Sequence, residues 1–118
     1  MQEMSGGGTR WTIRIMDSAE DDIRGAVRWS AQRFGEEQAR VYAETLMLAV
    51  TELGAGPNLV GVKQRDEIAA GLLSLHVARH GRRGRHFVMF RVVDEPTRVL
   101  EVLRVLHDAM DFPRHIPE

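Results

Sequence analysis

The spacing of apolar residues changes along the chain, and each change predicts a different element. In residues 11–16 apolar and polar side chains alternate, which is the pattern of a short strand with one buried face. From Ile23 to Phe34, and again from Ala39 to Leu53, apolar side chains recur every three or four positions, as they do in amphipathic helices. Because only a short link around Gly35 separates these helices, we expect an antiparallel helical hairpin.

After Gly71 the spacing returns to two. Three further strands are predicted near residues 73–77, 86–93 and 99–106, with a turn at 94–97 between the last two. The short connections indicate an antiparallel meander. The predicted order is therefore β-α-α-β-β-β, and the fold class is α+β, with the helical hairpin packed on a small antiparallel sheet so that its apolar stripe is buried.

The length of 118 residues indicates one domain. We place this domain at residues 11–112. Residues 1–10 are expected to form a flexible N-terminal tail, because the three successive glycines at 6–8 have no side chains to bury. Residues 113–118 are expected to form a C-terminal tail.

Composition excludes several classes of protein. The chain has 43% hydrophobic and 28% charged residues, a formal net charge of −1 and no cysteine. It is therefore expected to be globular, without disulfides, zinc sites built on cysteine or a thiol nucleophile. With no apolar run near ~20 residues and no secretory signal, we expect a cytoplasmic protein with no membrane partner.

Basic residues crowd the loop before the second strand of the meander, and no acidic residue occurs between His76 and Arg91. Guanidinium groups bind carboxylates and phosphates through paired hydrogen bonds, so this loop is a candidate partner-binding site. The alternative is a solvated loop whose charges only maintain solubility. The candidate partner-binding residues are Arg79, Arg82, Arg83, Arg85 and His86; His80 lies in the same basic loop.

The last predicted strand carries Glu101, Arg104 and His107. Alternation along a strand would place Glu101 and His107 on one face and Arg104 on the other. At the strand end, His107 is a candidate acid or base, since histidine has an ordinary pKa of ~6.5. The alternative is a surface or capping histidine.

The register of the last hairpin decides what Glu101 contacts. If Arg91 lies opposite Glu101, the two form a structural ion pair and Arg85 lies opposite His107. A slip by one residue would instead set Glu101 beside Phe90 and leave it unpaired. We predict the first register, and hence the pair Arg91–Glu101.

No metal or cofactor site is expected. His76 and His80 would be separated by ~13 Å along a strand. The chain has no nucleophile elbow, phosphate-binding loop or dinucleotide-binding glycine motif.

The ordered pattern resembles the ParE/RelE superfamily of bacterial type II toxins. The resemblance covers roughly residues 12–112. It rests on Ala19-x-x-Asp22-Ile23, Phe34-Gly35, Ala39, Leu46, Leu53, Pro57, Gly71, Phe90-Arg91-Val92 and, above all, the closing segment from Val102 to His107 followed by Met110-Asp111.

The superfamily resemblance implies one of two activities. Members similar to ParE bind DNA gyrase and block it without a known catalytic site of their own. Members similar to RelE are ribosome-dependent endoribonucleases, whose chemistry needs cations to offset phosphorane charge and a group that moves a proton.

This chain resembles the ParE branch more closely, because its closing segment is similar to that of the gyrase-directed toxins. Its only tyrosine, Tyr42, lies on a helix, and its only lysine is Lys63, so the C-terminal tyrosine and the lysines of many nuclease members are missing. Met110 stands where many relatives carry arginine. We therefore expect a protein-binding inhibitor rather than an enzyme.

Two alternatives remain at this point. The chain could be a RelE-like endoribonuclease, in which case the candidate catalytic residues are Arg83, Arg85, Arg104 and His107. It could also be a degenerate relative without toxicity. Both toxin branches imply a small, ParD-like or similar antitoxin in a hetero-oligomer. The antitoxin would dock by helix-in-groove or strand addition. No sequence-specific contact with nucleic acid is expected.

Overall fold

The computed structural model describes residues 2–4, 9–110 and 112–116. Both predicted helices are present, as α1 (Asp17–Phe34) and α2 (Glu36–Glu52), and the break between them is Gly35, whose φ of 93° favours glycine. The strands are β1 (Gln2–Met4), β2 (Thr12–Ile15), β3 (Lys63–Gln64), β4 (Leu73–His76), β5 (His86–Asp94) and β6 (Val99–His107); η1 (Leu53–Ala55) and η2 (Phe112–Arg114) are short 3-10 helices.

The strands form one mixed sheet in the order β1-β2-β6-β5-β4-β3. The predicted antiparallel meander β4-β5-β6 is confirmed, and so is the α+β class. The expectation of a wholly antiparallel sheet is wrong for one pair, because β2 runs parallel to β6. The chain between β2 and β6 contains the helical hairpin and the strands β3 to β5, and this connection is long enough for a parallel pair.

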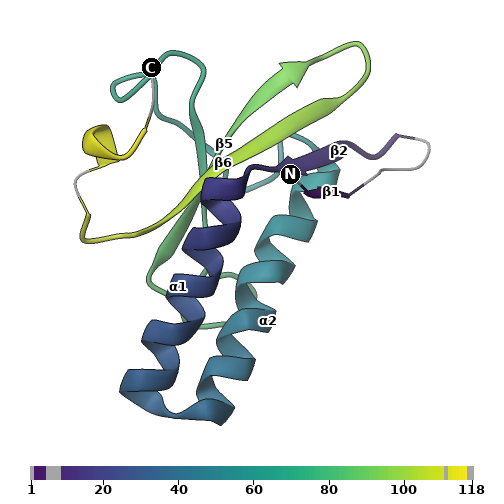
Figure 1. Ribbon diagram of the computed structural model, residues 1–118. Coiled ribbons are helices and arrows are strands. Elements are labelled where there is room, and N and C mark those ends of the chain that lie inside the picture. Colours follow the sequence, from purple (N-terminus) through teal and green to yellow (C-terminus); the bar gives the residue numbers. More distant parts are fainter. Residues whose placement is uncertain (1, 5–8, 111, 117–118) are drawn as a thin grey trace.

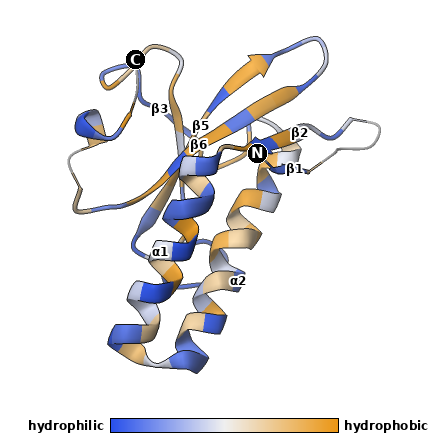
Figure 2. Cartoon of the chain, viewed as in Figure 1, coloured by the Kyte–Doolittle hydropathy of each residue, from blue (hydrophilic) through white to orange (hydrophobic). Residues whose placement is uncertain are grey.

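The helical hairpin packs on one face of this sheet (Figure 1). Polar and apolar residues alternate around each helix, as Figure 2 shows by colour. The apolar side of α2 contributes Leu46 and Val50 to a core that also contains Phe90 and Val102 from the sheet. All four are fully buried.

A second, smaller core covers the opposite face of the sheet. It contains Met89 and Leu106 from the strands, Leu72 from the preceding loop and Ile116 from the C-terminal segment. The Phe112 ring lies 5.5 Å from that of Phe87. The sequence analysis predicted a C-terminal tail from residue 113. The structure shows instead that this segment packs on the sheet through Ile116.

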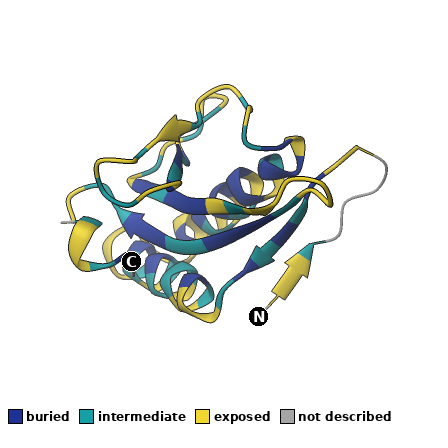
Figure 3. Cartoon of the chain, turned by 90° about the horizontal axis from the view of Figure 1, so that it is seen from above, coloured by how far each residue is buried: buried dark blue, intermediate teal, exposed yellow. Residues whose placement is uncertain are grey.

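The expected flexible N-terminal tail is also wrong for residues 2–4. They form β1, which pairs antiparallel with β2, and Glu3 accepts a hydrogen bond of 3.2 Å from Arg14. The three glycines lie outside the described residues. Figure 3 shows β1 as an exposed edge strand beside largely buried central strands.

Two bulges adjust the register of the β5–β6 hairpin. Arg91 lies opposite Glu101, as predicted, but Val93 and Leu103 have no direct partner. The extra residue at Leu103 shifts the end of the hairpin, so His86, and not Arg85, lies opposite His107. Among the described residues, no helix is both long and apolar enough to cross a bilayer.

Candidate functional site

The basic loop between β4 and β5 folds back against α2. Its first arginine, Arg79, is held there: the guanidinium donates to the Glu52 carboxylate at 2.8 and 3.0 Å and to the Val60 carbonyl at 2.8 Å. His80 adds a second contact to Glu52 at 2.9 Å. Burial opposes ionisation of Glu52, but the hydrogen bonds from Arg79 and His80 outweigh it and lower the pKa of that carboxyl.

The side chain of Arg79 is only 16% exposed. Arg79 is therefore not placed to contact a partner as predicted, and its geometry is that of a residue that ties the loop to the end of α2. Arg82 is half-buried. Its guanidinium donates to the Thr45 hydroxyl at 3.1 Å and to the carboxylate of the exposed Glu44 at 3.2 Å. Arg83 is exposed and pairs with no other side chain among the described residues, so its charge is available.

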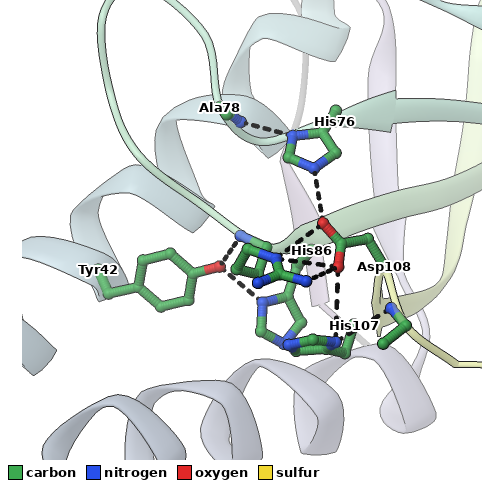
Figure 4. A network of polar contacts seen from close by, with 8 residues as sticks. Tyr42, His76, Ala78, His86, His107 and Asp108 are labelled. Atoms are coloured by element: carbon green, nitrogen blue, oxygen red, sulfur yellow. Dashed lines mark hydrogen bonds and ion pairs between the residues drawn. The ribbon is translucent and has the colours of Figure 1, made fainter. Parts of the chain in front are cut away.

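A network of polar side chains fixes the end of the loop (Figure 4). The Tyr42 hydroxyl of α2 accepts a hydrogen bond from the Arg85 backbone N–H at 2.9 Å and lies 2.6 Å from His86 Nδ1. His86 is buried and therefore cannot contact a partner directly as predicted. Burial and the neighbouring His107 lower the pKa of His86 to about 4, and burial raises the pKa of Tyr42.

Asp108 is the centre of a neighbouring cluster. The Asp108 carboxylate accepts hydrogen bonds from the Arg85 guanidinium at 2.9 and 3.0 Å. It lies 3.4 Å from the His76 ring and 3.7 Å from the His107 ring. The hydrogen bonds from Arg85 are the main reason that the pKa of Asp108 is lowered. This cluster brings two of the candidate nuclease residues, Arg85 and His107, to one carboxylate.

His107 lies on the helix face of the sheet, with its ring 5.5 Å from that of Trp29. Glu101 lies on the other face, between the core residues Leu100 and Val102. The prediction that His107 and Glu101 share a face is therefore wrong, because the bulge at Leu103 changes the alternation.

The predicted ion pair between Arg91 and Glu101 is confirmed, at 3.0 Å. Arg104 lies in a different cluster: it donates to both carboxylate oxygens of Asp22 at 2.7 and 2.9 Å and to the His115 carbonyl at 2.9 Å. The hydrogen bond to Asp22 raises the pKa of Arg104. This arrangement holds α1 and the C-terminal segment on β6.

Sequence reasoning did not identify the acidic partners of these basic groups. Glu52, Asp108 and Asp22 lie far from Arg79, Arg85 and Arg104 along the chain, so no local pattern relates them. The sequence analysis also did not predict that the Trp29 ring contacts the rings of Tyr42, His86 and His107, because the position of Trp29 on a helix indicates only packing. Among the described residues there is no cluster of three or more side chains able to hold a metal ion.

A groove of about 950 Å³ runs between the helical hairpin and the basic loop. One wall is formed by side chains of α1 and α2, including Trp29, Phe34 and Val41, and the other by residues 80–85. Thus the structure brings Arg82, Arg83 and Arg85 to one concave surface, whereas Arg79 and His86 lie behind it.

Known proteins provide independent information on this fold. Residues 13–112 match the family described as ParE toxin of type II toxin–antitoxin system, parDE. The chain is 34% identical over 104 residues to Toxin ParE1 of Caulobacter vibrioides, covering 87% of this chain and 95% of the relative. It is 33% identical over 84 residues to Toxin ParE1 of Mycobacterium tuberculosis, covering 71% and 76% respectively.

Two solved structures share the fold. One, titled as the chromosomal ParDE toxin–antitoxin system from P. aeruginosa, superposes with a TM-score of 0.67 at 17% identity over 85% of this chain and 98% of the other. The second is the toxin–antitoxin complex RelBE2 from Mycobacterium tuberculosis, with a TM-score of 0.56 at 24% identity over 90% and 100%. On the family match and the curated relatives, the chain belongs to the ParE toxin family of type II toxin–antitoxin systems.

Proposed function

We propose that this ParE-family toxin inhibits DNA gyrase through protein–protein contact and is neutralised by a cognate antitoxin. The observation that carries the choice of branch is the pairing of the basic groups that a nuclease would need. Arg85 and Arg104 each hold a carboxylate through two guanidinium nitrogens. A guanidinium paired in this way is poorly placed to offset phosphorane charge.

The antitoxin part of the proposal is supported by the relatives, since both structural neighbours are titled as toxin–antitoxin systems. Gyrase and ribosomes are both cytoplasmic, so the proposed activity places the protein in the cytoplasm. The expected partner is a small protein encoded beside the toxin.

The test is a pair of assays on the purified chain. We expect inhibition of gyrase supercoiling or accumulation of cleaved DNA, relieved when the product of the adjacent gene is added. We expect no codon-specific cuts in mRNA on translating ribosomes. Gyrase that remains fully active at saturating toxin, with folded protein verified by circular dichroism, would contradict the proposed target.

An endoribonuclease is the second candidate, and one observation favours it. His76 and His107 both lie within 4 Å of the Asp108 carboxylate, beside Arg85. Two imidazoles on one carboxylate can serve as acid and base for attack of a 2′-hydroxyl on phosphate. Cuts in mRNA that disappear in His107→Ala would support this function over gyrase inhibition.

A further inference from the structure

The edge of the sheet at β2 is covered by a very short strand. β1 pairs antiparallel with β2, with Gln2 opposite Ile15 and Met4 opposite Ile13. Gln2 and Glu3 are exposed, and Met4 packs against the core. Figure 3 shows this strand outside the buried strands of the sheet. The family match begins at residue 13, so β1 lies ahead of the region that this chain shares with ParE toxins.

The outer side of β2 depends on β1 for its backbone hydrogen bonds. On the inner side, the Thr12 N–H donates to the Arg98 carbonyl at 2.8 Å, and the Met16 N–H donates to the Val102 carbonyl at 3.0 Å. Backbone groups of successive strand residues point to opposite sides of the strand. The N–H and C=O groups of both β2 isoleucines therefore face β1, and without β1 they would form an open strand edge.

Charge favours β1 over a second copy of the chain at this edge. Glu3 lies opposite Arg14 and accepts a hydrogen bond from it at 3.2 Å. Arg14 in turn lies opposite Glu101 of β6, which lies opposite Arg91 of β5. The four charges therefore alternate in sign across four strands. Two copies of β2 that paired antiparallel through the same backbone groups would instead set Arg14 opposite Arg14, where like charges repel.

Contacts outside β1 hold β2 in place. The Arg10 guanidinium donates to the Thr51 carbonyl of α2 at 3.3 Å. The Trp11 N–H donates to the Gly54 carbonyl of η1 at 2.9 Å. Both isoleucines of β2 are buried in the core beneath the helices. Removal of β1 would therefore uncover a strand that stays formed.

The opposite edge of the sheet is protected in another way. β3 pairs with the first half of β4, and the loop that precedes β3 lies beside the rest. In that loop the Val60 carbonyl accepts a hydrogen bond from Arg79 at 2.8 Å. A Cβ added at Gly61 would lie 3.4 Å from the Leu75 side chain. An internal loop therefore protects this edge, whereas in the described part of the chain β2 is covered by β1 alone.

We propose that β1 is a strap within the chain that prevents two copies of this protein from associating through their β2 edges. A second copy is the occupant that fits an uncovered edge, because an antiparallel copy of a strand offers acceptors to its donors and donors to its acceptors. This role of β1 goes beyond the proposed function, and it depends neither on gyrase nor on the antitoxin.

Sedimentation velocity of the full chain and of three variants measures the association. The first variant lacks residues 1–8, which removes β1 and keeps the anchor at Arg10. Met4→Pro keeps the chain length but removes the N–H that faces Ile13. Glu3→Pro is the matched control, because the Glu3 N–H points away from β2 and its exposed ion pair contributes little. Circular dichroism establishes that each variant is folded.

Amide hydrogen exchange locates the contact. The amides of Ile13 and Ile15 should be protected in the full chain and should exchange rapidly in the dilute deletion variant. They should become protected again as the deletion variant associates at higher concentration. The amides of Thr12 and Met16, which donate on the side of β6, should stay protected throughout.

We expect the full chain and Glu3→Pro to remain monomeric, and the deletion variant and Met4→Pro to associate at least ~10-fold more strongly. Three sedimentation results would overturn the proposal: a deletion variant that stays monomeric over the same concentrations, a full chain that associates as strongly as that variant, and two proline variants that behave alike. Association of the deletion variant with the Ile13 and Ile15 amides still unprotected would also overturn it, because the contact would then lie elsewhere.

Discussion

His86 is a buried histidine that the fold keeps neutral. It faces Tyr42 on α2, Trp29 on α1 and His107 on β6. Burial and the charge of His107 lower its pKa to about 4, although Asp108 acts in the opposite direction. Because the unfolded chain has the ordinary value near 6.5, the unfolded state binds more protons between these two values.

It follows that His86 makes the fold lose stability as the pH falls from about 6.5 towards about 4. The loss from this residue approaches ~1.4 kcal/mol per pH unit within that window. We expect His86→Asn, whose amide can still bond the Tyr42 hydroxyl, to be less stable at pH 7 but less sensitive to acid.

Urea unfolding at several pH values would measure this difference. His80→Asn is the comparison, because the His80 side chain is 70% exposed and its ion-pair contact with Glu52 lies outside the His86 cluster. A wild-type protein and a His86→Asn variant with parallel stability profiles between pH 7 and pH 4.5 would show that the histidine is not held neutral by the fold.

Individual contacts were predictable from sequence only where a regular element relates the residues. Arg91 and Glu101 lie on adjacent strands of one hairpin, and their pairing was predicted correctly. The partners of Arg79 and Arg85 are Glu52 on α2 and Asp108 after β6. These contacts depend on how the loop folds back onto the helix, which no spacing in the sequence reports.

Among the elements, α1 and β6 are joined at the bulge of Leu103. The bulge frees backbone groups, and the first turns of α1 satisfy them: Ser18 donates to the Leu103 carbonyl at 2.9 Å, and Asp22 accepts from the Val105 N–H at 2.9 Å. The same Asp22 carboxylate holds Arg104. The bulge is therefore part of the contact between helix and sheet.

We expect Asp22→Ala to destabilise the fold by ~3 kcal/mol. The change leaves the Arg104 guanidinium, 23% exposed, with only the neutral His115 carbonyl, and it leaves the Val105 N–H without its acceptor. The control is Asp21→Ala, because Asp21 pairs with Arg24 at the surface, where the carboxylate is 72% exposed and an ion pair contributes only ~0–1 kcal/mol.

Chemical denaturation of the single variants and of Asp22→Ala combined with Arg104→Met would measure the coupling. The double variant should be less destabilised than the two single losses added together, by ~1–3 kcal/mol. Strict additivity would mean that the two side chains do not stabilise the fold as a pair.

At the level of elements, periodicity predicted both helices and the meander because these are long and amphipathic. It failed at the bulges, because one extra residue in a strand moves every later side chain to the opposite face of the sheet. The sequence between Glu101 and His107 carries no sign of the extra residue at Leu103. Periodicity also failed for β1, whose three residues carry no pattern and become a strand only by pairing with β2.

For the molecule as a whole, the two ends of the chain make unequal contributions to the fold. The N-terminal strand β1 lies at the edge of the sheet, with Gln2 and Glu3 exposed and only Met4 packed against the core. The C-terminal segment instead places Ile116, 7% exposed, in the second core, and its His115 carbonyl accepts from Arg104. The family match ends at residue 112, so much of this packing lies outside the matched region.

We therefore expect deletion of residues 111–118 to be much more harmful than deletion of residues 1–8. Burial of an isoleucine contributes ~1.5–3 kcal/mol, and the deletion also removes Phe112 from Phe87 and uncovers Met89 and Leu106. Its total cost should reach at least ~3 kcal/mol, whereas the N-terminal deletion should cost about 1 kcal/mol. Urea unfolding measures both losses, and a dye that binds apolar surface should respond to the C-terminal deletion alone. Equal losses from the two deletions would mean that the outer face of the sheet does not need its C-terminal cover.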